Sequence, residues 1–283
     1  MNRYRLTLLL AAALLACGAA FAQEPTREEY QARYERLVRN LGYDGVGIET
    51  VLDRWAEAYP DDPAVYQARF NYYLEKGRST EIVPMPGMRR FMGKQPALSL
   101  KDPEGGDVPY FEEDFYDEEN FGLAMRVLDQ QIAAHPNELR WYALKIPALC
   151  AYEKLSPDMA AAELKSLIRR QSSSKPAWTL DGEPADAEVF QQFVGEICYN
   201  FFQTGSDISY EYFREVSEQM NKLFPKNPVF LDNIGSYWHV ARSNDKQAEK
   251  YYKKALKIDP DDYAATRNLQ IIERQRAQSK AKK

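Results

Sequence analysis

The chain has 283 residues, with 37 lysines and arginines against 42 aspartates and glutamates, and a formal net charge of −5. Its hydrophobic fraction of 45% is too high for a disordered chain, and its 14 glycines are too few for a fibrous protein. The acidic balance argues against nucleic acid as a general partner, because phosphate binding requires a basic surface. A chain of this length can bury the core of one large domain or two small ones.

The first 22 residues have the features of a secretory signal peptide. Two arginines supply a positive start, an apolar run follows, and Ala-Phe-Ala at 20–22 places small residues before a cleavage point. Leu14-Leu15-Ala16-Cys17 resembles the bacterial lipoprotein site, which would give a lipid anchor at Cys17, so two processing routes are open. The Ala-Phe-Ala site favours ordinary cleavage. Either route exports the protein, and we expect a periplasmic or cell-envelope location without a membrane span.

Export leaves two cysteines, Cys150 and Cys198, in the mature chain. An even pair in an oxidising compartment can form a disulfide. Both residues, however, stand in apolar helical runs, which favours buried free thiols. Both alternatives remain open from the sequence.

The first part of the mature chain predicts three helices. Thr26 and Glu29 form a capping box that opens a helix ending at Gly42. Apolar residues then recur at helical spacing up to the stop at Pro60, and another helix runs from Pro63 to Gly77. Residues 78–116 break the pattern with five prolines and four glycines, and they lack sustained period-two alternation. We expect a long loop there, unusual enough to be a functional element.

Helices resume at Asp117, which can act as an N-cap, and no strand is expected downstream. The first of these helices stops at Pro136, and the next carries Pro147 as a kink. Ser156 is the expected N-cap of the following helix, and a polar linker reaches from 172 to 184. The remaining helices are expected at about 185–203, 207–223, 228–242, 245–257 and from Asp261 or Asp262, before a basic disordered tail at 275–283.

Four helices end in the same way, at Pro60, Pro136, Pro225 and Pro260, each followed by polar residues and a new helix. The last two prolines are separated by about one unit of a 34-residue helix–turn–helix repeat. Self-similarity at a fixed period predicts units that bury their faces by stacking.

The unit at 228–261 resembles a tetratricopeptide repeat (TPR). Leu231 stands at that family's usual Trp and Trp238 at its Tyr; the other matching positions are Ile234, Gly235, Ala248, Tyr252, Ala255 and Pro260. The turn between its helices, at 242–244, is about one residue longer than the family's. The resemblance implies an all-α fold over 23–274, a right-handed superhelical α-solenoid of about five irregular TPR-like helix pairs plus a C-terminal capping helix.

The family's use is to hold a peptide or partner helix in a concave groove, which implies an exported scaffold or adaptor that mediates protein–protein interaction. The corresponding positions of this chain are Gln67, Asn71, Tyr142, Asp232, Ser236 and His239. They do not reproduce the family's carboxylate clamp. Their neutral-to-acidic character points to a polar or basic protein or peptide, whose identity stays open, as does the oligomeric state.

Few residues suggest chemistry. His135 is expected to cap a helix C-terminus, and His239 to be a half-exposed structural residue, with a ligand contact as the alternative. Without clustered histidines and cysteines, a zinc site is not expected, and no nucleotide or serine-hydrolase motif indicates a cofactor or an enzyme. The acidic and aromatic segment 110–119 leaves one alternative, a carbohydrate-handling or hydrolytic envelope protein. The other interpretation of this segment is an acidic helix start whose aromatics pin the loop.

Overall fold

A computed structural model describes residues 24–281, so the predicted signal peptide, the Cys17 site and the last two residues lie outside the described part. Within that range the chain is mostly helical, with eleven α-helices, one π-helical turn and five short strands. The expectation of a predominantly helical protein is confirmed. None of the described helices is both long and apolar enough to cross a membrane. The chain divides after Lys76 into two compact units.

The first unit contains α2 (Arg27–Leu41), α3 (Ile48–Ala58) and α4 (Pro63–Lys76). The capping box is present, because Thr26 Oγ1 accepts a hydrogen bond from the Glu29 amide while the Glu29 carboxylate accepts one from the Thr26 amide. Gly42 follows α2 with a φ of 72°, as a helix-terminating glycine does. The three helices bury Trp55 and the aliphatic side chains around it, so the predicted periodicity of this region is confirmed.

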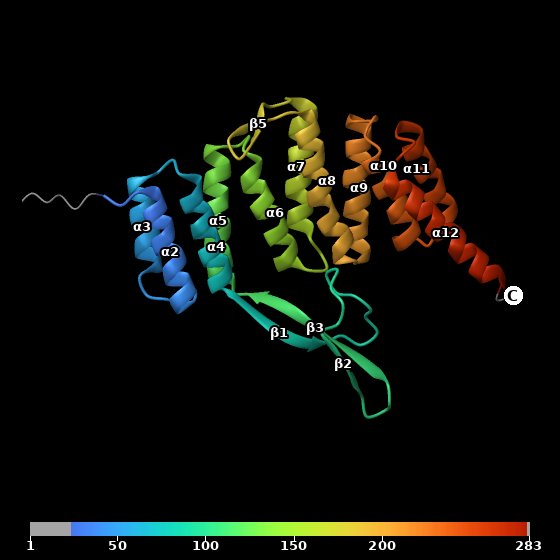
Figure 1. Ribbon diagram of the computed structural model, residues 1–283, viewed down its shortest axis with the longest axis horizontal. Coiled ribbons are helices and arrows are strands. Elements are labelled where there is room, and N and C mark those ends of the chain that lie inside the picture. Colours follow the sequence, from blue (N-terminus) through green and yellow to red (C-terminus); the bar gives the residue numbers. More distant parts are fainter. Residues whose placement is uncertain (1–23, 282–283) are drawn as a thin grey trace, which may run out of the picture. The chain divides into compact units, whose positions relative to one another are not determined.

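The second unit contains eight helices: α5 (Glu118–Ala134), α6 (Leu139–Glu153), α7 (Asp158–Ser173), α8 (Ala187–Thr204), α9 (Asp207–Leu223), α10 (Val229–Ser236), α11 (Asp245–Ile258) and α12 (Tyr263–Ala281). The π-helical turn η1 (Tyr237–Ala241) continues α10. These helices follow one another side by side (Figure 1). Besides contacts between consecutive helices, α6 contacts α8, α7 contacts α9, and α10 contacts α12. Helices α6 and α8 therefore lie next to each other, as do α7 and α9 and, further along the chain, α10 and α12.

Helix ends agree with the sequence where the cap lies close by in the chain. Asp117 accepts a hydrogen bond from the Asn120 amide ahead of α5, and His135 is the C-cap of the same helix. Pro147 lies inside α6, as expected. The prediction for Ser156 is wrong. The Glu153 carboxylate instead accepts hydrogen bonds from the amides of Met159 and Ala160 and so satisfies the first turn of α7.

The predicted loop at 78–116 is wrong, because much of it forms an antiparallel sheet. Its strands are β1 (Arg78–Pro84), β2 (Leu98–Lys101) and β3 (Asp107–Tyr116), in the order β1-β3-β2. The sheet extends away from the helices of its unit (Figure 1). Only Phe111 is fully buried on it, packed edge-on against Phe91. A sheet that covers so little core has no need of alternating apolar residues, so the sequence signal for strands is absent.

The expected polar linker at 172–184 also contains a hairpin. Its strands β4 (Trp178–Leu180) and β5 (Glu183–Ala185) pair around Asp181 and Gly182, both of which have positive φ. An Asp-Gly pair is typical of a tight hairpin turn in which both residues have positive φ. The sequence did not predict this hairpin, because strands of three residues are too short to show alternation of apolar and polar side chains.

Helix α12 extends to Ala281, so it continues through most of the segment 275–283 that was expected to be a disordered tail.

Cys150 and Cys198 are both free and buried, and no disulfide joins them. Burial raises the pKa of each thiol to about 12, because a thiolate would lose its hydration there.

Candidate binding groove between two helices

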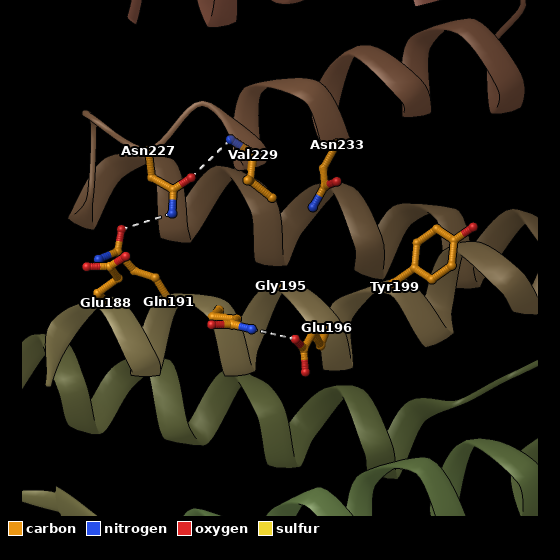
Figure 2. Close-up of a pocket in the computed structure, with 9 residues that line it drawn as sticks. Glu188, Gln191, Gly195, Glu196, Tyr199, Asn227, Val229 and Asn233 are labelled. Atoms are coloured by element: carbon orange, nitrogen blue, oxygen red, sulfur yellow. Dashed lines mark hydrogen bonds between the residues drawn. The ribbon is translucent and has the colours of Figure 1, made fainter. Parts of the chain in front are cut away.

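An open groove lies between α8 and the start of α10 (Figure 2). Its volume is about 630 Å³. The lining side chains come from one face of α8 and from the segment that begins α10: Glu188, Gln191, Gln192, Gly195, Glu196, Tyr199, Asn227, Val229 and Asn233.

The floor of the groove is apolar because α8 carries a glycine where it faces α10. A methyl group at Gly195 would first meet the Cγ1 atom of Val229, at 3.9 Å, so the absence of a side chain keeps the space open. Val229 remains 47% exposed, and Tyr199, further along α8, is 50% exposed. Together with Gly195, the exposed side chains of Val229 and Tyr199 form a small apolar surface, whose exposure to water is unfavourable.

Hydrogen bonds fix some of the polar side chains that surround this floor. Asn227 donates to Gln191 at 3.1 Å and accepts from the Val229 amide at 3.0 Å, which ties the start of α10 to α8. Gln192 donates to Glu196 at 2.9 Å. In Figure 2 the side chains of Gln191 and Asn227 face each other from the two sides of the groove. The amides are therefore held in position by neighbours within the protein.

Other polar groups of the groove are unused. The carboxylate of Glu188, the amide of Asn233 and the hydroxyl of Tyr199 make no hydrogen bond to any residue between 24 and 281. Glu188 and Glu196 both carry negative charge, and no lysine or arginine is among the lining residues described. The groove thus offers an apolar floor, free hydrogen-bonding groups and a negative potential, a combination that suits a cationic and partly apolar ligand.

Three of the residues predicted for a groove lie on α6 and α10 of the second unit, and two of them are buried. Tyr142 is only 4% exposed, and its hydroxyl donates to the Pro136 carbonyl while it accepts from Arg170. Asp232 is 6% exposed. The Ser236 hydroxyl is 3.1 Å from that of Tyr252. Tyr142 and Asp232 are thus almost fully buried, and a partner contact at these positions stays a prediction.

The other three predicted residues are more accessible but lie elsewhere. Gln67 and Asn71 are half-buried on α4, in the first unit. His239 is half-buried on η1, with Nδ1 2.8 Å from the Asp245 carboxylate. This contact joins the imidazole to the first residue of α11. None of the six predicted residues lines the α8–α10 groove.

The sequence did contain a signal for α8. Its buried side chains recur with helical period, at Phe190, Phe193, Val194, Ile197, Cys198 and Phe201. The opposite stripe combines polar residues with an isolated glycine and an exposed tyrosine, at Glu188, Gln192, Gly195, Glu196 and Tyr199. A glycine in the middle of a helix weakens the helix, so its presence beside an exposed aromatic points to a surface that something else occupies.

The acidic segment 110–119 forms β3 and the start of α5, and its carboxylates take different partners. Glu113 pairs with Lys154, which also lies over the Phe115 ring. Asp114 accepts from Thr80 at 2.6 Å. Burial alone would raise the pKa of Asp114, but the Thr80 hydrogen bond and the positive charge of Arg78 hold it below its usual value.

A cavity of about 170 Å³ beside this strand is lined by Glu112, Glu113 and Asp114 together with Lys154 and residues around Phe91. Asp117, further along the segment, is the α5 N-cap and does not line it. Three carboxylates therefore line one small cavity. Two of them are already paired with cations, Glu113 with Lys154 and Asp114 with Arg78. Among the described residues, no group of three or more His, Cys, Asp or Glu side chains could hold a metal ion.

Comparison with known proteins adds no assignment. No protein-family model matches the chain, and no curated protein is similar to it at a significant level.

Proposed function

We propose that this protein is an exported adaptor that holds a basic, extended segment of a partner protein in the groove between α8 and α10. The observation that carries the proposal is the groove itself, with an open apolar floor at Gly195 and Val229 and two uncompensated glutamates. The scaffold would be a TPR-like α-solenoid, and the signal-like first 22 residues would direct it to the bacterial envelope.

The packing of the last helix pair supports the TPR-like scaffold. Gly235 lies directly against the ring of Tyr252, and Ala248 and Ala255 on α11 are completely buried. These are the small and aromatic positions at which the sequence resembles the repeat. Close approach of two helices requires small residues of this kind where the helices cross. The contacts of α6 with α8 and of α7 with α9 are of the kind expected between stacked helix pairs, and they support this scaffold.

The chemistry of the groove supports a peptide-like occupant. Side-chain amides such as that of Asn233 both donate and accept, so they can pair with the N–H and C=O groups of an extended backbone. Glu188 and Glu196 would attract lysine or arginine side chains and would chiefly raise the association rate. A single groove of this size, with few apolar anchors, is expected to bind in the micromolar range.

Fluorescence anisotropy with two labelled peptides tests the proposal. One peptide alternates lysine with valine, and the other replaces every lysine by glutamate. We expect the lysine peptide to bind with a Kd of tens of micromolar and the glutamate peptide to bind at least about tenfold more weakly. Gly195→Arg should abolish binding of the lysine peptide, because the new side chain fills the floor and places a positive charge beside the acids.

Matched variants separate a groove from general attraction to an acidic protein. The double variant Glu188→Lys/Glu196→Lys reverses the charge of the groove, whereas Glu57→Lys/Glu104→Lys makes the same change in net charge at exposed sites outside it. Only the first should weaken binding by about tenfold or more. Equal losses in both double variants, or no loss in Gly195→Arg, would contradict a binding site between α8 and α10.

A further inference from the structure

Another hollow lies on the surface of α12, the last helix in the row of the second unit (Figure 1). Its volume is about 390 Å³. Steps of three and four residues along one helix bring its side chains onto a single stripe. The lining residues are Tyr263, Thr266, Arg267, Gln270, Ile271 and Arg274. None of them lines the α8–α10 groove, so this hollow is a separate site that does not depend on the proposed function.

The opposite side of α12 packs against the protein. Helix α12 contacts α11 and α10. Ala265 and Ile272 are completely buried there, and Leu269 packs beside them. The stripe that lines the hollow is exposed apart from Ile271, which is half-buried, and Tyr263 reaches 73% exposure. Helix α12 therefore presents to solvent a surface onto which a further helix could pack.

The hollow carries positive charge that no acid compensates. Arg267 and Arg274 form no ion pair with any residue between 24 and 281. Arg276, on the other side of the helix, does pair, with Glu249. Glu273 is the single acid of α12, and it does not line the hollow. Seven residues separate the two unpaired arginines, so they lie about 10 Å apart along the helix axis.

The residue types in the hollow favour a protein partner. Arginine and tyrosine are enriched at the centres of protein interfaces, whereas lysine is depleted there. The guanidinium of Arg267 lies 6.0 Å from the centroid of the Tyr263 ring, a cation–π contact that holds it at one end of the hollow. The preceding helix, α11, instead exposes five lysines and has no arginine. An anionic membrane attracts lysine and arginine alike, so arginine combined with tyrosine indicates a more specific contact.

We propose that the α12 hollow is a docking site for an acidic amphipathic helix of a partner protein, which packs on α12 as one more helix of the row. Two carboxylates seven residues apart on the partner helix face Arg267 and Arg274, because both helices have the same rise per residue. Each arginine can bind a carboxylate through two parallel N–H···O bonds. Apolar side chains between the two acids cover Ile271 and the Tyr263 ring.

Fluorescence anisotropy with the purified protein and two labelled, hydrocarbon-stapled helical peptides of identical composition tests the proposal. The matched peptide has glutamates at positions i and i+7 with leucines at i+3 and i+4. The shifted peptide exchanges the second glutamate with a glutamine, so that its acids stand at i and i+5 and face different sides of the helix. We expect the matched peptide to bind at least about fivefold more tightly, because it alone engages both arginines.

Variants of the protein separate the hollow from general attraction. Arg267→Glu/Arg274→Glu should weaken binding of the matched peptide by about tenfold or more, because attraction becomes repulsion at both positions. Arg54→Glu/Arg169→Glu makes the same change in net charge at exposed sites outside the hollow and should alter binding by less than about twofold. Circular dichroism of both double variants should match that of the unmodified protein, since all four side chains are exposed.

Three outcomes would overturn the proposal. The first is equal affinity for the two peptides, or equal losses in the two double variants. The second is binding to phosphatidylglycerol vesicles that Arg267→Glu/Arg274→Glu abolishes, in a protein that does not bind the matched peptide, since the surface would then contact a membrane. The third is self-association that the same double variant abolishes, again without peptide binding, since a second copy of the chain would then cover α12.

Discussion

Gly235 offers the sharpest test of how the last helix pair is packed. A Cβ atom at this position would lie 2.6, 2.8 and 2.9 Å from three ring atoms of Tyr252. Ordinary contacts of a Cβ atom begin at about 3.4 Å, so the ring would have to retreat by most of an ångström. Tyr252 is completely buried and its hydroxyl meets that of Ser236, so the ring has little room to move. Gly235→Ala should therefore destabilise the protein.

The magnitude follows from three contributions. Overpacking of a filled core costs about 1–3 kcal/mol. Loss of the Tyr252–Ser236 hydrogen bond adds about 1 kcal/mol. Alanine in place of glycine inside a helix returns about 1 kcal/mol. We expect a net loss of about 2 kcal/mol. Gly195→Ala is the matched control, since its methyl group meets only Val229 at 3.9 Å, and this variant should be neutral or up to about 1 kcal/mol more stable.

Urea denaturation followed by circular dichroism measures both variants. Gly235→Ala should lower the midpoint without changing the slope, and Gly195→Ala should leave the midpoint equal or higher. In a Tyr252→Leu background the smaller side chain removes the clash, so adding Gly235→Ala there should cost less than about 0.5 kcal/mol. A Gly235→Ala variant as stable as the parent chain, or one equally destabilised in both backgrounds, would refute the assumption that Tyr252 closes on Gly235.

Three further outcomes are expected. Thr26→Ala should cost about 1 kcal/mol in urea denaturation because it removes the N-cap of α2, whereas Thr266→Ala, which caps no helix, is the control. Cys150 and Cys198 should react with a thiol reagent at pH 8 only after the protein unfolds, and fast labelling of the folded protein would contradict their burial. Burial raises the pKa of Asp232 to about 8. From pH 5 to pH 8 the unfolding free energy should therefore fall by at least about 1 kcal/mol more in the unmodified protein than in Asp232→Asn, and parallel pH profiles would contradict a raised Asp232 pKa.

The sequence predicted the features that depend on residues close together in the chain. Three predicted caps are confirmed: the capping box of Thr26, the N-cap of Asp117 and the C-cap of His135. Each of these capping groups forms its hydrogen bond with a residue only a few positions away in the chain. Glu153 shows the limit of this reasoning. It reaches forward past Ser156 to the amides of α7, and a carboxylate that arrives from the end of the preceding helix has no fixed spacing to recognise.

The groove was missed because its position depends on contacts between helices. Asp232 and Asn233 are adjacent on α10, yet the first is buried inside the unit and the second lines the groove. Periodicity alone gives the order of residues around a helix, and it does not say which side the neighbouring helix will cover. On α8, whose helix was predicted but matched to no repeat, Gly195 in a polar stripe marks an unusual face, but nothing in the sequence shows that the start of α10 lies opposite it.

The order of the three-stranded sheet has a consequence for solubility. Because β3 is central, β1 and β2 are both edge strands, and one face of the sheet exposes the apolar side chains of Ile82, Leu98 and Leu100. Such edges invite strands of other molecules to add to them. Here β1 ends at Pro84, which has no N–H to offer, and β2 is four residues long and ends at charged Lys101. These two ends are natural barriers to aggregation, and removing both with Pro84→Val and Lys101→Val should make the protein self-associate while its helices remain folded.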